Sequence, residues 1–194
     1  MTSTATALPP DLQKILSDIE GADRAAESLS SGLSEAQFHW QPDGGRSWSV
    51  AQCLEHLATI NVLYGGAVQS GIDLARRKGW PRTGPLTPGF FGRKFIASQE
   101  PPVKRRVGAP PKVRPGSQLT RAEILQRYHA AHERVKQSIR EAATIDANRA
   151  TFPNPFLGIL RVKVATGLYV IAAHDRRHLW QAEQVIARQD FPRE

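Results

Sequence analysis

The sequence predicts an all-α protein, a four-helix bundle with a long crossover connection between its second and third helices. Four segments carry apolar residues at the i, i+3, i+4, i+7 spacing of an amphipathic helix. No segment shows convincing strand alternation. The 40 residues of 79–118 separate the second helical segment from the third, which is long enough to cross a bundle from end to end. We expect residues 1–194 to form one domain.

The two N-terminal helices have recognisable ends. The first runs from Pro10 to about Leu29, because proline suits the start of a helix. The second follows Ser49, which has capping-box spacing to Gln52, and it ends at Gly71 or Gly79. Their apolar stripes are Leu12, Ile15, Leu16, Ile19, Ala22 and Ala26 in the first, and Val50, Cys53, Leu54, Leu57, Asn61, Tyr64 and Val68 in the second.

The two C-terminal helices are bounded in a similar way. Thr120 and Glu123 have the spacing of another capping box, and the helix that follows fades near Ala143. The last helix comes after the proline-containing stretch 152–155, which cannot lie inside a helix, and it ends near Gln189. Their apolar stripes are Ile124, Leu125, Tyr128, Ala131, Val135 and Ile139 in the third helix, and Leu160, Val164, Leu168, Ile171, His178, Ala182 and Val185 in the fourth.

The connection 79–118 differs from the rest of the chain in composition. It holds eight Pro, six Gly and eight Lys or Arg against one acid, so it carries +7 of the net charge of +8. A connection of this length without secondary structure is usually functional or disordered. Its basic run Lys104-Arg105-Arg106, with Phe90, Phe91 and Phe95, could contact phosphates and bases. No established nucleic-acid-binding signature accompanies these residues, so nucleic acid is the least favoured partner.

The chain shows no sign of secretion or of a membrane span. Cys53 is the only cysteine, so no intramolecular disulfide can form, which fits a reducing compartment. Residues 1–10 have neither the basic start nor the apolar run of a signal peptide. The longest apolar stretch, 164–173, is half the length that a membrane span of ~20 residues needs. We expect a soluble cytoplasmic protein without a membrane partner.

The most informative motif is His174-Asp175-Arg176-Arg177-His178. Two histidines four residues apart on a helix lie on one side, with Cβ atoms about 5–6 Å apart. One metal ion can bridge them, because imidazole nitrogens bind at about 2 Å. His56, in the second helical segment, lies on the shoulder of an apolar stripe. Together His56, His174 and His178 predict an interior metal site with room left for water or substrate.

A plainer interpretation of the pair His174 and His178 stays open. A chain with six histidines can contain such a pair by chance, and both would then be surface residues beside Arg176 and Arg177. Asp175 falls on the inner stripe, where it could contact a ligand rather than the metal ion, orienting a histidine or pairing with an arginine. It could equally form an ordinary intrahelical ion pair. The spacing matches the His-Glu-x-x-His helix of zinc proteases, but Asp replaces Glu and two Arg follow, so we do not expect a protease.

The remaining candidates for ligands are weaker. His129 and His132 lie near one face of the third helix; they could be extra ligands, but we expect both to be solvated. His39 is expected to be a loop or packing residue. Cys53, one turn before the first histidine of the site, could be a ligand or a nucleophile, but a free cysteine on an apolar stripe is usually a small buried hydrophobe.

Two motifs resemble those of the DinB-like superfamily. The stretch from Trp48 to Leu57 (WSVAQCLEHL) resembles its second-helix motif, and the stretch from His174 to Gln181 (HDRRHLWQ) resembles its fourth-helix motif. The approach Asn154-Pro155-Phe156-Leu157-Gly158 is also typical of the family. The two motifs occur together and in the family's order, which is more specific than either alone.

The resemblance implies a four-helix bundle and a divalent metal ion held by His56, His174 and His178. Zinc, nickel, iron and manganese are all compatible with such a site. Family members include thiol S-transferases that use bacillithiol or mycothiol and a thiol-dependent isomerase, and homodimers are common. The basic, Pro-rich connection departs from the plainest members of the family.

Three functions therefore compete. The first is a metal-dependent transferase or hydrolase acting on a small molecule, with a low-molecular-weight thiol as a possible cofactor. The second is a non-catalytic metal-binding stress protein, in which the ion ties helices together. The third and least favoured is nucleic-acid binding through the basic connection. The first two share every ligand, so the sequence cannot separate them.

Overall fold

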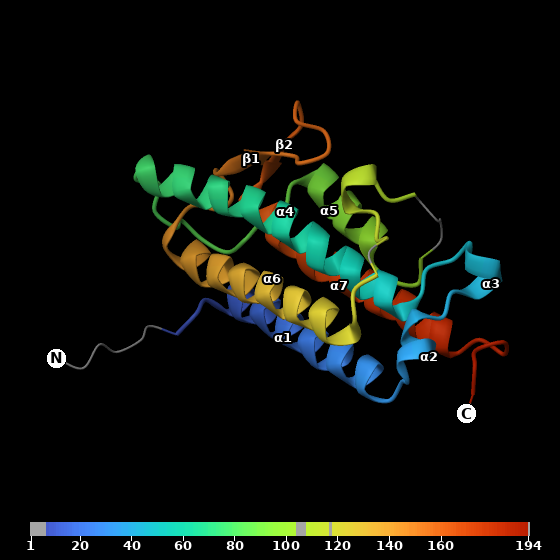
Figure 1. Cartoon of the computed structure of the whole chain (residues 1–194). Coiled ribbons are helices and arrows are strands. Elements are labelled where there is room, and N and C mark those ends of the chain that lie inside the picture. Colours follow the sequence, from blue (N-terminus) through green and yellow to red (C-terminus); the bar gives the residue numbers. More distant parts are fainter. Residues whose placement is uncertain (1–6, 104–107, 117, 194) are drawn as a thin grey trace.

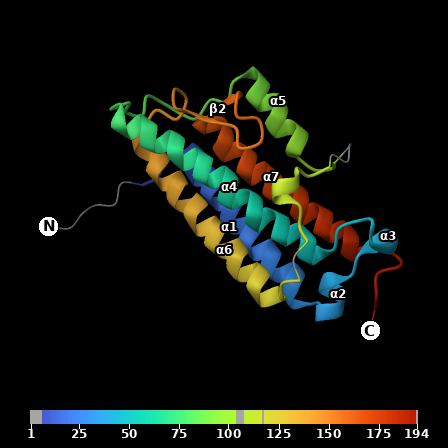
Figure 2. The ribbon, with the colours of Figure 1, turned by 45° about the horizontal axis from the view of Figure 1, so that its top comes forward.

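The computed structural model describes residues 7–103, 108–116 and 118–193 and forms a helical bundle, which confirms the predicted all-α class (Figure 1). Its four long helices are α1 (Pro10–Ser31), α4 (Val50–Arg77), α6 (Arg121–Glu141) and α7 (Val164–Ile186). Helices α1 and α4 each pack against both α6 and α7, so the four surround one core (Figure 2). The shorter elements are α2 (Glu35–His39), α3 (Pro42–Gly45), α5 (Phe90–Gln99), η1 (Pro111–Val113), η2 (Ala142–Thr144), β1 (Thr151–Pro153) and β2 (Arg161–Lys163).

The predicted helix starts at Ser49 and Thr120 are confirmed. Ser49 and Gln52 form a complete capping box at the start of α4, and Thr120 and Glu123 form another at the start of α6. In each, the hydroxyl accepts from the backbone N–H three residues later, and the partner side chain accepts from the cap residue's own N–H. These contacts satisfy backbone donors that a helix start leaves without a partner.

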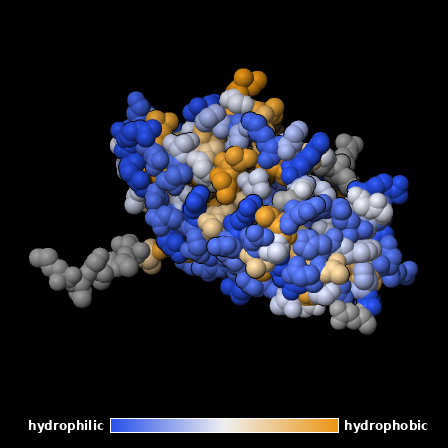
Figure 3. Space-filling view, viewed as in Figure 1, coloured by the Kyte–Doolittle hydropathy of each residue, from blue (hydrophilic) through white to orange (hydrophobic). Residues whose placement is uncertain are grey.

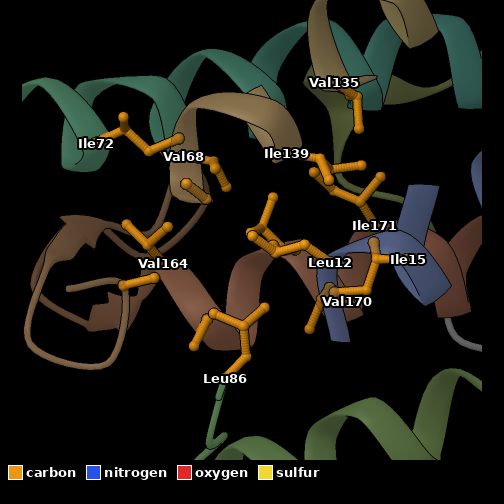
Figure 4. Packing of buried hydrophobic residues seen from close by; sticks show 14 of the residues in the cluster. Leu12, Ile15, Val68, Ile72, Leu86, Val135, Ile139, Val164, Val170 and Ile171 are labelled. Carbon is orange, nitrogen blue, oxygen red and sulfur yellow. The ribbon is translucent and has the colours of Figure 1, made fainter. Parts of the chain in front are cut away.

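The predicted apolar stripes of the four helices form the core, apart from Leu160, which is exposed, and Leu125, which is half-buried (Figure 4). Around one end of the bundle, Leu12 and Ile15 of α1 meet side chains of the other three long helices. Gly167 of α7 is packed closely there: an added Cβ would lie 2.8 Å from the ring of Phe152 and 2.8 Å from Val68. A second cluster, built around Phe38, Leu54, Leu57 and Tyr128, fills the other end.

Two segments differ from the sequence-based expectation. Helix α7 begins at Val164 rather than near Leu160, because residues 161–163 pair antiparallel with 151–153 as the short hairpin β1–β2. The connection 79–118 has secondary structure of its own: helix α5 lies along α7, and η1 packs on α4. The described parts of the connection lie over α4 and α7 (Figure 2).

The visible surface is mostly hydrophilic (Figure 3). Hydrophobic side chains gather at the top of this view, where Figure 1 places the hairpin connection. In that connection Ile159 is 99% exposed. Among the described helices, none combines the length and the apolar character that a membrane crossing requires.

Candidate metal centre

The three histidines singled out from the sequence converge between α4 and α7. His56 of α4 and His178 of α7 are buried, and His174 of α7 is half-buried. One nitrogen from each ring lies within 4.8 Å of the other two. The Nε2 atoms of His56 and His174 are 3.1 Å apart. The i, i+4 spacing on α7 therefore supplies two nitrogens, and the adjoining helix supplies the third.

Each of the three rings has an oxygen near its other nitrogen, Nδ1. The Nδ1 of His56 lies 2.6 Å from the backbone oxygen of Val113, and that of His174 lies 3.1 Å from Oε1 of Gln99. The Nδ1 of His178 lies 3.0 Å from Oε1 of Gln181. A backbone carbonyl only accepts, so His56 carries its proton on Nδ1 and has a lone pair on Nε2. The same tautomer at the other two rings turns all three Nε2 lone pairs toward one point.

Trp48 forms an aromatic wall of the site. It precedes the N-cap of α4, and its ring stacks on His178 with centroids 5.6 Å apart and an interplanar angle of 29°. Its centroid lies 4.9 Å from that of His56. The residue just before the start of α4 thus contacts two of the histidine rings.

The surroundings keep the three imidazoles neutral. Burial lowers the pKa of His56, and burial together with the neighbouring imidazoles lowers the pKa of His178 well below its ordinary value. For His174, burial, then His56 and then the Arg177 guanidinium lower the pKa to about 3. Metal ions bind the neutral form of histidine, so these rings can bind a metal ion at neutral pH without first losing a proton.

These residues fit a transition-metal ion. When both rings carry their proton on Nδ1, the Nε2 atoms of His56 and His174, 3.1 Å apart, face each other with their lone pairs, an arrangement that a cation between them stabilises. Nitrogens about 2 Å from a shared ion come to such a separation in a tetrahedral or octahedral site. An oxygen behind each ligand nitrogen is the usual companion of histidine coordination. Three buried histidines that can hold a metal ion are therefore present.

Asp175 does orient a histidine, but that histidine is His132. Its Oδ1 accepts from the Asn61 amide at 2.9 Å, and its Oδ2 lies 3.3 Å from Nε2 of His132. On the other side of that ring, Nδ1 lies 2.6 Å from Asp23. Burial alone would lower the pKa of His132, but Asp175 and Asp23 raise it to about 9, so the ring is a cation at neutral pH. Asp23, Asn61, His132 and Asp175 come from α1, α4, α6 and α7, so their contacts connect all four long helices.

The expectation that His132 is solvated is therefore wrong, since its side chain is 0% exposed. Its neighbour His129 does lie near the surface, 2.7 Å from Glu27. His39 ends α2 and packs edge-on against Phe38. Cys53 is buried, as expected, and burial raises the pKa of its thiol, so it is a neutral hydrophobic residue of the core rather than a nucleophile.

The connection 79–118 contributes two oxygens to the site. Gln99 and Val113 both come from it, and neither stands in a recognisable motif. Of its basic residues, Arg82 pairs with Asp11 at 2.8 Å on the bundle. The run Lys104-Arg105-Arg106 lies outside the described residues. Only Gln181 carried a signal in the sequence, because it follows His178 by three positions, which is one helical turn.

The comparisons with known proteins agree with the fold and with the histidine motifs. The pattern of the DinB superfamily matches residues 18–182, which include all of α4, α5, α6 and the three histidines. No curated protein and no solved structure matches the chain. The family match spans most of the chain, and the chain therefore belongs to the DinB superfamily.

Proposed function

We propose that the protein is a metal-dependent enzyme in which His56, His174 and His178 hold a divalent transition-metal ion. The observation that supports this most is the ring arrangement, in which one nitrogen of each histidine lies within 4.8 Å of the other two and each Nδ1 has an oxygen beside it. Three neutral ligands leave the ion its full charge, so it would lower the pKa of a bound water or thiol and supply a nucleophile at neutral pH. Zinc, nickel, iron and manganese are all compatible with this ligand set.

The half-buried Arg177 favours an anionic substrate or thiol. Its guanidinium lowers the pKa of all three histidines, which places a positive charge beside the centre. Its Nη1 also donates to the backbone oxygen of Ser98 at 3.1 Å. A thiolate or carboxylate entering the site would meet this charge together with that of the ion, so we propose a low-molecular-weight thiol as co-substrate. Trp48 would give the apolar part of the substrate a surface to stack on.

Turnover by the metal-loaded protein tests this proposal. Low-molecular-weight thiols, including bacillithiol and mycothiol, would be offered with an electrophilic acceptor, and ester and amide substrates would be offered without a thiol. We expect metal-dependent turnover in one of these assays, lost in His178→Ala. A protein that binds metal but turns over none of these substrates would instead support the second candidate.

That second candidate is a non-catalytic metal-binding protein. It is favoured by one feature: the ligands come from two helices, so an ion would tie α4 to α7. In that case chelation would lower the stability of the fold, and metal would have no effect on any thiol or ester substrate.

A further inference from the structure

The end of α5 is attached to the histidine motif of α7 by three successive residues. Each of the residues 98–100 contacts a different side chain of that motif, and none of these contacts is between apolar groups. They are the Ser98 backbone oxygen with Arg177 Nη1 (3.1 Å), Gln99 Oε1 with His174 Nδ1 (3.1 Å), and the Glu100 carboxylate with Arg176 (2.6 and 2.9 Å). A segment distant in sequence thus follows α7 along the metal centre.

The same connection reaches the centre at a second point. The η1 turn presents the backbone oxygen of Val113 to His56 at 2.6 Å, and the Val113 side chain is buried. Two of the three histidines, one on each helix, therefore take their Nδ1 partner from this connection. His178 takes its partner, Gln181, from its own helix. We call α5 with Glu100, together with η1, the cap.

Besides these contacts, helix α5 lies close to α7 at Gly92, where an added Cβ would lie 2.7 Å from Thr166. None of its ten residues is buried, and Phe90, Phe91 and Phe95 are 46% to 83% exposed. Ile96 packs partly against the core. An isolated helix of this length is marginal in water, so the polar contacts at its end decide how firmly it docks. Segments of this kind open more easily than the rest of a fold.

We propose that the cap is part of the metal centre and that Gln99 and the Val113 carbonyl position His174 and His56 to coordinate through Nε2, an inference that rests on the metal binding proposed above. With an oxygen at Nδ1, each ring keeps its proton there and points its lone pair at the ion. The coupling is reciprocal: the free energy that the docked cap adds to metal binding is the free energy that the metal adds to docking. Gln99 is a positioning residue that acts through His174.

Zinc affinity, measured by competition with a chromophoric chelator, tests the role of Gln99. Gln99→Ala removes the oxygen, and we expect zinc to bind about tenfold more weakly. Gln99→Glu keeps an oxygen at the same place, so we expect it to bind zinc at least as tightly as the wild type. Gln181→Ala removes the Nδ1 partner of His178 without touching the cap, so it should also weaken zinc binding, and it serves as the control for the response of α5 to zinc. Thermal unfolding of the metal-free variants should be alike.

Amide hydrogen exchange in the intact protein tests the coupling. We expect zinc to slow exchange across residues 90–99 in the wild type and in Gln181→Ala at saturating zinc. In Gln99→Ala, also measured at saturating zinc, this protection should be smaller. The effect of zinc on amide exchange in α6 should be the same in the wild type and in both variants. If Gln99→Ala bound zinc as tightly as the wild type, or if zinc left the amide exchange of α5 unchanged, the role of the cap would be overturned. The metal site itself would be unaffected by either result. A folded wild type that binds no zinc or other divalent metal would overturn both.

Discussion

His56 on α4 and His174 on α7 hold their Nε2 atoms 3.1 Å apart, although 118 residues separate them in the chain. His56 is buried and His174 is half-buried between the two helices, and the Val113 carbonyl fixes the proton of His56 on Nδ1. When His174 donates its own Nδ1 proton to Gln99, the pair presents two lone pairs to the same small space. The tilted Trp48 ring against His56 and the contact of Gln99 with His174 hold these two rings in that position.

Metal should stabilise the fold, because the ligands join two helices. An ion that binds only the folded state at a free concentration of about 100 times its Kd adds about 2.7 kcal/mol to the free energy of unfolding. We expect the melting temperature to fall on treatment with a chelator and to recover when the metal is restored. In His56→Ala the chelator should have no effect, which separates loss of the bound ion from other actions of the reagent.

Removing one partner of the buried ion pair between His132 and Asp175 should lower the free energy of unfolding by several kcal/mol. His132→Gln leaves the carboxylate without its cation in the core, so we expect a loss of about 3 kcal/mol in the free energy of unfolding. The control is His129→Gln, three residues earlier on α6, whose side chain is 34% exposed and pairs with Glu27. That change should shift stability by no more than about 0.5 kcal/mol. Urea denaturation at pH 7 measures both, and equal effects would contradict the role given to His132.

The pH dependence of stability should show the raised pKa of His132. Its folded-state pKa of about 9 exceeds the ordinary value of 6.5, so the folded protein holds this proton more tightly than the unfolded chain does. The resulting stabilisation is fully present below pH 6.5 and is lost as the pH rises through 9. The difference in unfolding free energy between wild type and His132→Gln should shrink over that range. A difference that stays constant from pH 6 to about 9.5 would show that the ring is neutral in the fold.

The close packing at Gly167 predicts a large effect of one methyl group. In Gly167→Ala the new Cβ would lie 2.8 Å from both Phe152 and Val68, so helix α7 or the hairpin must shift. We expect a loss of about 2 kcal/mol in the free energy of unfolding. Gly66→Ala is the matched control: it lies in the interior of α4, exposed, with no atom within 4 Å of the added Cβ. There the higher helix propensity of alanine should stabilise the protein by about 0.5–1 kcal/mol.

The features that the sequence predicted best are those set by residues close together in the chain. The starts of α4 and α6 depend on side chains three positions from Ser49 and Thr120, and the pairing of His174 with His178 depends on one helical turn. The apolar stripes predicted the core because each long helix buries one face. The hairpin β1–β2 has strands of three residues, too short for alternation to show.

What the sequence did not show depends on contacts between distant segments. His132 has the same local surroundings as a solvated residue, and it is buried because Asp23 of α1 and Asp175 of α7 meet it from either side. The role of Gln99 arises only when α5 docks on α7, 75 residues further along the chain. No periodicity within one helix contains this information, and the Pro, Gly and charge content of 79–118 suggested a connection without structure.

Metal content tests the central claim most directly. Untagged wild-type protein and His178→Ala would be purified side by side, with folding checked by circular dichroism, and analysed by inductively coupled plasma mass spectrometry. We predict that the wild type holds about one equivalent of a single transition metal per chain, bound at the three-histidine site, and that the variant holds none. A folded wild type that holds no metal, even after reconstitution with zinc, nickel, iron and manganese, would contradict the metal centre and the function proposed from it.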